Sequence, residues 1–338
     1  MKPVFCFGEL LLRMSPLPSA QWIKKASMPV YVGGAECNVA AALAAWQLPV
    51  QYCTALPKNG LADDICGVLS AKGIDVSPVL FSGSRIGIYY LVQGTDLKHA
   101  GVIYDRSHSS FSELEPNTIN WDELLKGAGW FHFSAISPAL NEKAALVCKE
   151  ALASAQKNNL TISVDLNHRA KLWQYGKQPV EVMPELVNYC DVIMGNIWSA
   201  NALLGISLDE HIHEKGSQEA YLQQAEETAL EMMQRFPACK TVAQTFRFDK
   251  GNGIRYYATV NNGNQQYISG EYSVDAIQDK VGSGDCFMAG LIYGLSGQKS
   301  LQYTVDFAAA AAVGKMNEFG DSTNQTIHTV EQIMNHHD

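Results

Sequence analysis

Short apolar runs alternate with amphipathic helical patterns along most of this chain. The apolar runs predict buried strands at residues 4–7, 52–55, 130–134, 161–165, 192–194 and 241–244. Between them, helical patterns cover residues 35–47, 62–72, 142–157 and 218–236. Alternation of strand and helix is typical of a mostly parallel sheet covered by helices on both faces. We therefore predict an α/β fold with three layers.

Three stretches depart from this rhythm. Residues 11–32 alternate and carry three prolines, and residues 85–104 contain two β-rich runs around a Gly/Asp turn, which is a hairpin signal. We expect them to form a small separate β layer, a flap over the carboxyl edge of the sheet; an ordinary edge hairpin is the alternative. Residues 254–274 are also β-rich, with a turn at 261–263. The small-residue helix at 307–316 allows close approach of another helix or of a flat ligand.

Composition narrows the class of protein. The 338 residues allow two domains or one large α/β domain, and 47% hydrophobic residues against 17% charged ones exclude global disorder. No apolar run reaches the roughly 18 residues that span a bilayer. The net charge of −9, without a block of Lys or Arg, argues against binding to nucleic acid or to an anionic membrane.

Cysteine and histidine spacing indicates no metal site and a reducing compartment. The eight cysteines show neither a C-x-x-C pair nor zinc spacing, so we expect free thiols and a cytoplasmic protein. His211 and His213, flanked by Glu210 and Glu214, form either a metal site or a solvated charged segment. Positions i and i+2 do not face each other on a helix, which favours the second. Gly8-Glu9 and Arg13 interrupt the first apolar run, so it predicts a buried strand and not a signal peptide.

The most informative segment is the glycine-rich stretch before the apolar helix that starts near residue 286. Gly282 and Gly284 flank Ser283, and such glycines can turn successive N–H groups toward an anion at a helix N-terminus. Asp285 then lies at the mouth of the anion site, either as the base that accepts a hydroxyl proton or as a helix cap. Phe287 breaks the dinucleotide fingerprint G-x-G-x-x-G, and no P-loop sequence is present.

A second set of polar residues follows the strand at 161–165. Asp165, Asn167 and Arg169 recur at period two, so they project to one side at the carboxyl end of a parallel strand, where ligands bind. Arg106 and Arg169 would supply two cationic forks suited to a planar carboxylate. The alternatives are an ion pair of Arg169 with Asp165 or Glu181, and a solvated hairpin end for Arg106.

Two motifs in order carry a resemblance to a family. Residues 279–285 (DKVGSGD) resemble the D-[TS]-x-G-[AS]-G-D signature of ribokinase-like (PfkB-type) sugar kinases, and residues 33–40 (GGAECNVA) resemble its G-G-[AS]-x-x-N-x-A signature. The stretch 58–75 matches as well, so the resemblance covers essentially the whole chain. Within the family, the chain is most similar to the 2-keto-3-deoxygluconate kinases, through Gly8-Glu9, Ala35-Glu36, Tyr104-x-Arg106 and the D-x-N-x-R-x-x-L-W run at 165–173.

The resemblance implies a fold, a reaction and a set of site residues. It implies one ribokinase-like domain over residues 1–338, with a lid formed by 11–32 and 85–106. The reaction would be ATP-dependent phosphorylation of the terminal hydroxyl of 2-keto-3-deoxygluconate to the 6-phosphate, with Mg²⁺ arriving on ATP and no dedicated metal ligand. Asp285 would be the base, aided by the amides of Gly282 and Gly284. The residues implied for the sugar acid are Gly34, Asn38, Tyr89, Tyr104, Arg106, Arg169 and Asp321. Those implied for the nucleotide are Asn167, Asn196, Arg247, Gly282, Ser283, Gly284 and Lys315.

Two departures from the family pattern leave alternatives open. The family's N-x-x-E, whose glutamate organises magnesium-bound water, has Ser199 in the acid's place, so Glu36 or Asp191 could take over that role. The usual Lys-[LR]-Gly strand end reads Gln-Thr-Phe-Arg, which puts Arg247 in place of a phosphate-contacting lysine. The alternatives are a kinase for fructose, another keto-aldonate or a nucleoside, and a catalytically silent sugar-acid sensor. A homodimer through apolar lid residues such as Ile88, Tyr90 and Val102 is a further expectation.

Overall fold

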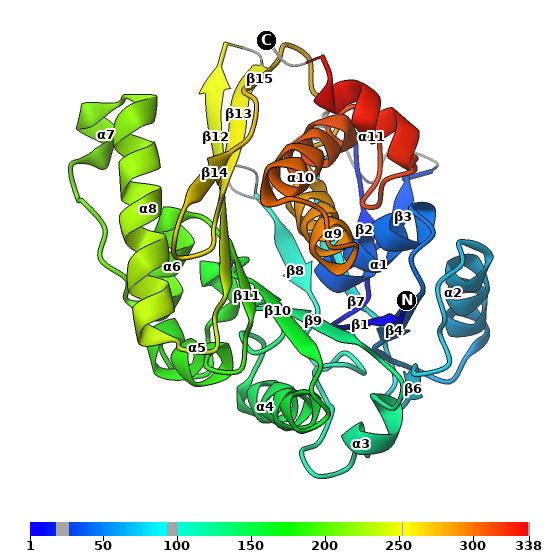
Figure 1. Ribbon diagram of the computed structural model, residues 1–338. Coiled ribbons are helices and arrows are strands. Elements are labelled where there is room, and N and C mark those ends of the chain that lie inside the picture. Colours follow the sequence, from blue (N-terminus) through cyan, green and yellow to red (C-terminus); the bar gives the residue numbers. More distant parts are fainter. Residues whose placement is uncertain (18–26, 93–100, 252, 337–338) are drawn as a thin grey trace.

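The predicted apolar runs become neighbouring strands of one sheet. The computed structural model describes residues 1–17, 27–92, 101–251 and 253–336 (Figure 1). Its parallel strands stand in the order β4-β1-β9-β10-β11-β12. Their bounds are β1 Val4–Phe7, β4 Val50–Cys53, β9 Trp130–Ser134, β10 Thr161–Asp165, β11 Val192–Gly195 and β12 Thr241–Lys250. This confirms the mostly parallel α/β sheet.

The β-rich region after β12 extends the sheet with antiparallel strands. It consists of β13 (Gly253–Asn261), β14 (Gln266–Ile268) and β15 (Tyr272–Val274), and β13 pairs with all of its neighbours in antiparallel register. Strand β12 runs beyond the predicted end at residue 244, because β13 pairs with it as far as Lys250.

Helices cover both faces of the sheet. Side chains alternate between the faces: Val4 and Cys6 lie in one core cluster, and Phe5 and Phe7 lie in the other. On the first face pack α1 (Ala35–Ala45), α9 (Ser283–Ser296) and α10 (Leu301–Lys315), and on the second α4 (Glu142–Lys157), α5 (Pro179–Val187), α6 (Ile197–Leu204) and α8 (Gln218–Arg235) (Figure 1). The remaining elements are α2 Gly60–Ala71, α3 Trp121–Leu124, η2 Ala170–Leu172, α7 Ile212–Lys215, α11 Ile327–Met334, β5 Ala55–Leu56 and β6 Leu80–Phe81.

Close helix packing explains the small residues of α10. A Cβ on Gly290 of α9 would lie 2.6 Å from the Cα of Ala308 on α10. The alanines of α10 from Ala308 to Ala312 are fully buried. Of the two expectations for this helix, the packing of another helix against it is the one that the structure shows.

Strands from two of the three stretches that depart from the βα rhythm, 11–32 and 85–104, form a separate four-stranded sheet, called the small sheet here. Its order is β3 (Val30–Gly33), β2 (Leu11–Met14), β7 (Gly87–Tyr90) and β8 (Ile103–Asp105). The alternative of an ordinary edge hairpin is therefore wrong; the predicted hairpin turn itself lies at 93–100, outside the described residues. The inner face of the small sheet is buried, and its Leu11 and Tyr89 pack near Val281 of the glycine-rich segment. Val102 is buried in the same cluster, so it is not part of the exposed apolar surface we expected.

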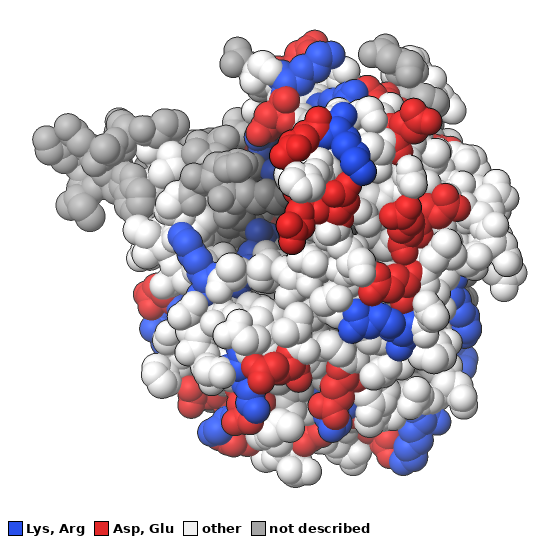
Figure 2. Space-filling model, turned by 90° about the vertical axis from the view of Figure 1, so that its left-hand side faces the viewer, with Lys and Arg blue, Asp and Glu red and all other residues white. Residues whose placement is uncertain are grey.

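The surface and the thiols agree with the composition. On the face drawn in Figure 2, basic side chains lie scattered among acidic ones. All eight cysteines are free, and seven of them are buried. In the described part of the chain, no helix combines the length and the apolar character that crossing a membrane requires.

Candidate active site

A cleft of about 390 Å³ opens at the carboxyl ends of β10 and β11, between the N-terminus of α9 and the small sheet. It collects nearly all of the predicted site residues. The predicted residues that line it are Gly34, Asn38, Tyr89, Tyr104, Arg106, Asn167, Arg169, Asn196, Arg247, Gly282, Ser283, Gly284, Asp285 and Asp321. Segments far apart in the sequence therefore converge on one cavity, at the sheet edge where parallel α/β proteins bind ligands.

The glycine loop (residues 282–284) has the geometry of an anion site at the start of α9. Gly282 is the residue before the helix and has a left-handed backbone with φ of 80°, which a side chain would strain. No side chain of the described residues caps this helix, so the N–H groups of its first turn are available to a ligand. A Cβ on Gly284 would meet nothing within 4 Å, which leaves open space where a phosphoryl group would approach. The helix dipole adds partial positive charge there.

Asp285 is a buried carboxylate in the first turn of α9. Because Gly282 precedes the helix as its N-cap, the alternative role of Asp285 as a helix cap is wrong. The Asn38 side chain on α1 donates a hydrogen bond of 2.7 Å to its Oδ2. Burial raises the pKa of Asp285 to about 6, against the opposing effects of the Asn38 hydrogen bond and of Arg169. A carboxylate with this pKa is ionised at neutral pH and can still accept a proton.

Asp321 joins the small sheet to the glycine loop. Its Oδ2 accepts a 2.7 Å hydrogen bond from the Tyr89 hydroxyl, and its Oδ1 lies 2.8 Å from Nε of Arg13. Arg13 also binds both carboxylate oxygens of Asp279, with its Nη2 at 2.6 Å from Oδ2. A Cβ on Gly282 would lie 1.9 Å from the carbonyl oxygen of Asp321, so only glycine permits this contact. The acid that begins the glycine-rich signature is thus fixed to the small sheet.

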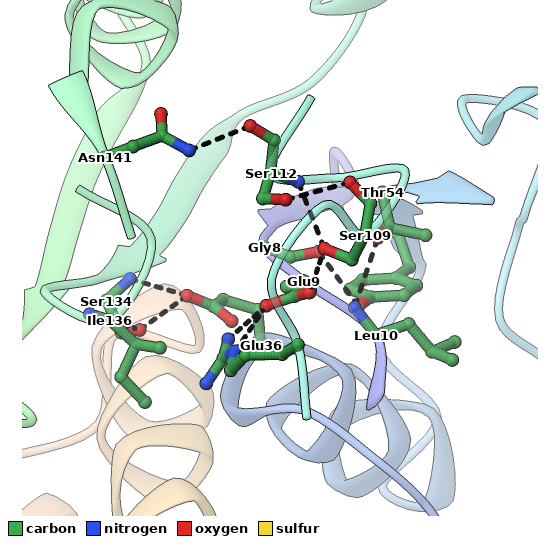
Figure 3. Close-up of polar contacts among 12 residues, drawn as sticks. Gly8, Glu9, Leu10, Glu36, Thr54, Ser109, Ser112, Ser134, Ile136 and Asn141 are labelled. Atoms are coloured by element: carbon green, nitrogen blue, oxygen red, sulfur yellow. Dashed lines mark hydrogen bonds and ion pairs between the residues drawn. The ribbon is translucent and has the colours of Figure 1, made fainter. Parts of the chain in front are cut away.

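The two predicted arginines differ in their surroundings. Arg169 lines the cleft, and neither Asp165 nor Glu181 forms an ion pair with it among the described residues. Arg106 also lines the cleft, but it is only 6% exposed, so the alternative of a solvated hairpin end is wrong. Its Nε and Nη2 both bind Oε2 of the buried Glu9. Oε1 of Glu9 accepts a hydrogen bond from Ser109 (Figure 3). Arg106 therefore reaches the cleft with one edge of its guanidinium already occupied.

Ser199, at the position of the family glutamate, closes a capping box at the start of α6. Its N–H and hydroxyl exchange hydrogen bonds with Asn196, whose Oδ1 accepts from the Ser199 N–H at 2.8 Å. Asp191 cannot replace the glutamate, because it precedes β11, at the opposite edge of the sheet, and binds Lys240. Glu36 does not line the cleft; Ser134 donates to its Oε1 through N–H and hydroxyl (Figure 3). Burial raises the pKa of Glu36 to about 7.

Lys315 and the histidine pair lie away from the positions we expected. Lys315, a predicted nucleotide contact, is fully buried and does not line the cleft. His213 stacks on Trp198 with ring centroids 5.5 Å apart, whereas His211 is exposed beside Glu214. Among the described residues no group of three or more His, Cys, Asp or Glu could hold a metal ion. The two histidines therefore have different partners, Trp198 for His213 and Glu214 for His211.

Sequence reasoning missed several residues around the cleft. Four residues line the cleft although the sequence did not predict that they contact a ligand: His168, Trp198, Thr245 and Lys280. In the sequence, Arg13 interrupts an apolar run, and a lone charge in the strand sequence LLRM is a signal of a buried ion pair. Its partners lie more than 260 positions away and could not be inferred from local pattern.

A glycine-lined anion site beside a buried carboxylate and a polar cleft defines a phosphotransferase that acts on an alcohol group. Comparison with known proteins agrees. Residues 1–327 match the family model described as "pfkB family carbohydrate kinase". The chain therefore belongs to this family and has its ribokinase-like fold.

Several similar proteins are named as kinases of sugars or sugar acids. The crystal structure of 2-dehydro-3-deoxygluconokinase from Thermotoga maritima is 35% identical, with a TM-score of 0.89, over 99% of this chain and 100% of that one. The 2-dehydro-3-deoxygalactonokinase of Haloferax volcanii is 27% identical over 97% of this chain and 95% of its own length. A putative ribokinase II from E. coli, in complex with ATP and Mg²⁺, shares the fold at 18% identity, with a TM-score of 0.75 and coverage of 100% of both chains.

Proposed function

We propose that this kinase transfers the γ-phosphoryl group of ATP to the terminal hydroxyl of 2-keto-3-deoxygluconate (2-dehydro-3-deoxygluconate), giving the 6-phosphate. The observation that carries the proposal is the position of Asp285, a buried carboxylate at the mouth of the glycine loop in a cleft that also contains Arg169. The similarity to the Thermotoga maritima enzyme over the whole chain supports the substrate class.

Asp285 is suited to remove the hydroxyl proton. Phosphoryl transfer to an alcohol needs a group that accepts the proton as the new P–O bond forms. The Asn38 hydrogen bond fixes one oxygen of Asp285 and leaves the other without a hydrogen-bond partner among the described residues. With a pKa of about 6, the carboxylate is the predominant form at pH 7 and is more basic than an exposed aspartate.

The glycine loop is suited to the transferring phosphoryl group. Its helix N-terminus presents N–H groups to the oxygens on which charge accumulates, and the space beside Gly284 leaves room for them. The carboxylate and amide oxygens of Asp165, Asn167 and Asn196 line the same cleft and are ligands of the kind that Mg²⁺ accepts. Bound with ATP, Mg²⁺ neutralises phosphate charge.

The sugar acid would lie between α1 and the small sheet. Arg169 supplies the cation for the carboxylate, and Arg106 adds the edge of its guanidinium that Glu9 does not occupy. The phenol rings of Tyr89 and Tyr104, with centroids 6.5 Å apart, form the wall of the small sheet. We propose that the small sheet acts as a lid that keeps water, a competing acceptor, away from the phosphoryl group.

One alternative substrate has a specific observation in its favour. The Haloferax volcanii relative, which aligns with nearly the whole chain, bears the name of a kinase for the galactonate epimer. The epimer differs in one hydroxyl configuration and carries the same carboxylate, so the arginines do not discriminate between the two sugar acids. Neutral sugars such as fructose and nucleosides such as adenosine would leave Arg169 without a partner.

The test is ADP release in a coupled spectrophotometric assay with four acceptors: both epimeric sugar acids, fructose and adenosine. We expect turnover of the sugar acids, with the highest kcat/KM for 2-keto-3-deoxygluconate. Preference for the galactonate epimer would support the alternative substrate. Turnover restricted to fructose or adenosine would refute the sugar-acid assignment, and no turnover of any acceptor would favour a silent sugar-acid sensor.

A further inference from the structure

Lys315, the last residue of α10, lies directly behind the glycine loop. Its side chain is fully buried and does not reach the cleft. The Nζ donates one hydrogen bond of 3.1 Å to the carbonyl oxygen of Glu318. The Cε lies 3.4 Å from the position that a Cβ on Gly282 would take. The ammonium group is therefore separated from the anion site by little more than the backbone of the loop.

The C-terminal loop (residues 318–321) encloses this ammonium group from the other side. The Asp321 carbonyl oxygen would contact a Cβ on Gly282 at 1.9 Å, so this loop and the glycine loop touch through their backbones. Lys315 is anchored to the C-terminal loop through Glu318 and packs against Gly282. It thus lies at the junction of the two loops that carry Asp321 and Asp285.

Burial of the Lys315 ammonium is unfavourable, because desolvation disfavours a charged amine. A methionine would fill the same space without this cost, so the charge itself is expected to have a function. Burial lowers the pKa of Lys315, and the carboxylates of Asp279, Glu318 and Asp321 act against this and favour its charged form. In return, the Lys315 charge lowers the pKa of Asp285. The ammonium is thus electrostatically coupled to the candidate base without contacting the cleft.

We propose that Lys315 is a positioning residue, a fixed internal cation that holds the glycine loop and the C-terminal loop together and adds positive potential behind the anion site. This role deepens the proposed function and rests on it. Its effect passes through the glycine loop and Asp285, so it concerns the rate of transfer more than the binding of the sugar. A role confined to filling space would be satisfied by a neutral side chain of the same size.

The first test replaces the charge and keeps the volume. We expect Lys315→Met to lower kcat by roughly 10- to 100-fold and to leave KM for the sugar nearly unchanged. A loss of this size is typical when a residue that orients the groups of a site, without contacting the ligand, is replaced. The exposed Lys126→Met is the matched control and should retain the kcat of the wild type. The acid limb of the pH–kcat profile should also move to higher pH, because loss of the cation disfavours ionised Asp285. The other charged or titratable groups that interact with Asp285 among the described residues are unchanged in this variant: Glu36, Cys37, Asp165, Arg169, Cys286 and Asp321.

The second test restores the charge from solution. Lys315→Ala removes three carbons and the amine, the atoms of n-propylamine, so n-propylammonium chloride should raise its kcat in a saturable way. n-Propanol, of similar size without charge, should not. Circular dichroism and thermal denaturation report whether each variant is folded.

The outcomes separate the inference from the proposed function. The role of Lys315 would be overturned if Lys315→Met kept the kcat and the pH profile of the wild type. It would also be overturned if n-propylammonium failed to rescue Lys315→Ala, whether or not that variant is folded. If the wild type phosphorylates a different sugar, the proposed substrate fails, and the same variants assayed with that sugar still decide the role of Lys315.

Discussion

We predict that the hydrogen bond from Asn38 to Asp285 sets the pH below which the enzyme loses activity. Asn38 on α1 donates to Asp285 Oδ2 at 2.7 Å, and both side chains are buried. This bond favours the charged carboxylate, so its removal in Asn38→Ala should raise the pKa of Asp285. Because the base must be ionised to accept a proton, the acid limb of kcat/KM should then move to higher pH.

The size of the shift follows from the energy of the bond. A hydrogen bond to a charged group contributes about 1.5–3 kcal/mol. At about 1.4 kcal/mol per pKa unit, its loss corresponds to a rise of about one to two units. With a pKa of about 6 for Asp285, the acid limb is expected near pH 6 in the wild type and between about pH 7 and 8 in the variant.

The assay is kcat/KM for the sugar acid from pH 5 to pH 9, because this parameter reports the pKa of the free enzyme. Asn188→Ala, at an exposed position at the end of α5, is the matched control and should keep the wild-type profile. If the acid limb of folded Asn38→Ala remained at the wild-type pH, or moved to lower pH, Asp285 would not be the group that limits the rate in acid.

Three other substitutions test the site. Asp285→Asn should lower kcat at least ~100-fold. In urea unfolding at pH 8, the same variant should be more stable than the wild type by up to about 3 kcal/mol. The reason is that the pKa of Asp285 is raised from 3.8 to about 6, so the folded wild type loses stability as the pH rises between these values, and the difference between the two proteins should vanish near pH 4. Lower stability of the variant at pH 8 would contradict the raised pKa. Arg169→Met should raise KM for sugar acids by about 10- to 100-fold, which corresponds to the loss of one charge-assisted hydrogen bond of about 1.5–3 kcal/mol, with little change for a neutral ketose. Equal losses for both would exclude carboxylate binding by Arg169. Arg13→Met should destabilise the fold by about 3–5 kcal/mol in urea, because it leaves Asp279 and Asp321 buried without their cation, and an unchanged midpoint would show that this pairing is not required.

The sequence predicted those features that depend on local pattern. The strands β1, β9 and β10 and the helix α4 have the predicted bounds, because apolar runs and helical periodicity are properties of neighbouring residues. The departure at Ser199 was visible in its motif, whereas the capping box that it forms with Asn196 is a finding of the structure.

Features that depend on distant partners could not be predicted. The Arg106–Glu9 pair joins residues 97 positions apart, and the Arg13–Asp279 pair joins residues 266 positions apart. The resemblance implied a nucleotide contact for Lys315, but its side chain is buried and binds the carbonyl oxygen of Glu318 in the C-terminal loop. The sequence indicated Arg106 and Lys315 as site residues, but only the tertiary fold decides that Arg106 faces the cleft and Lys315 does not.

The identity of the phosphorylated product tests the central claim most directly. Wild-type enzyme with ATP, Mg²⁺ and 2-keto-3-deoxygluconate can be followed by phosphorus NMR with proton coupling, which reports the carbon that bears the new phosphate. The account predicts one product, whose phosphorus couples to the two protons of the terminal carbon, as in the 6-phosphate. A phosphate on a secondary hydroxyl, or ATP consumption without a phosphorylated sugar acid, would contradict it.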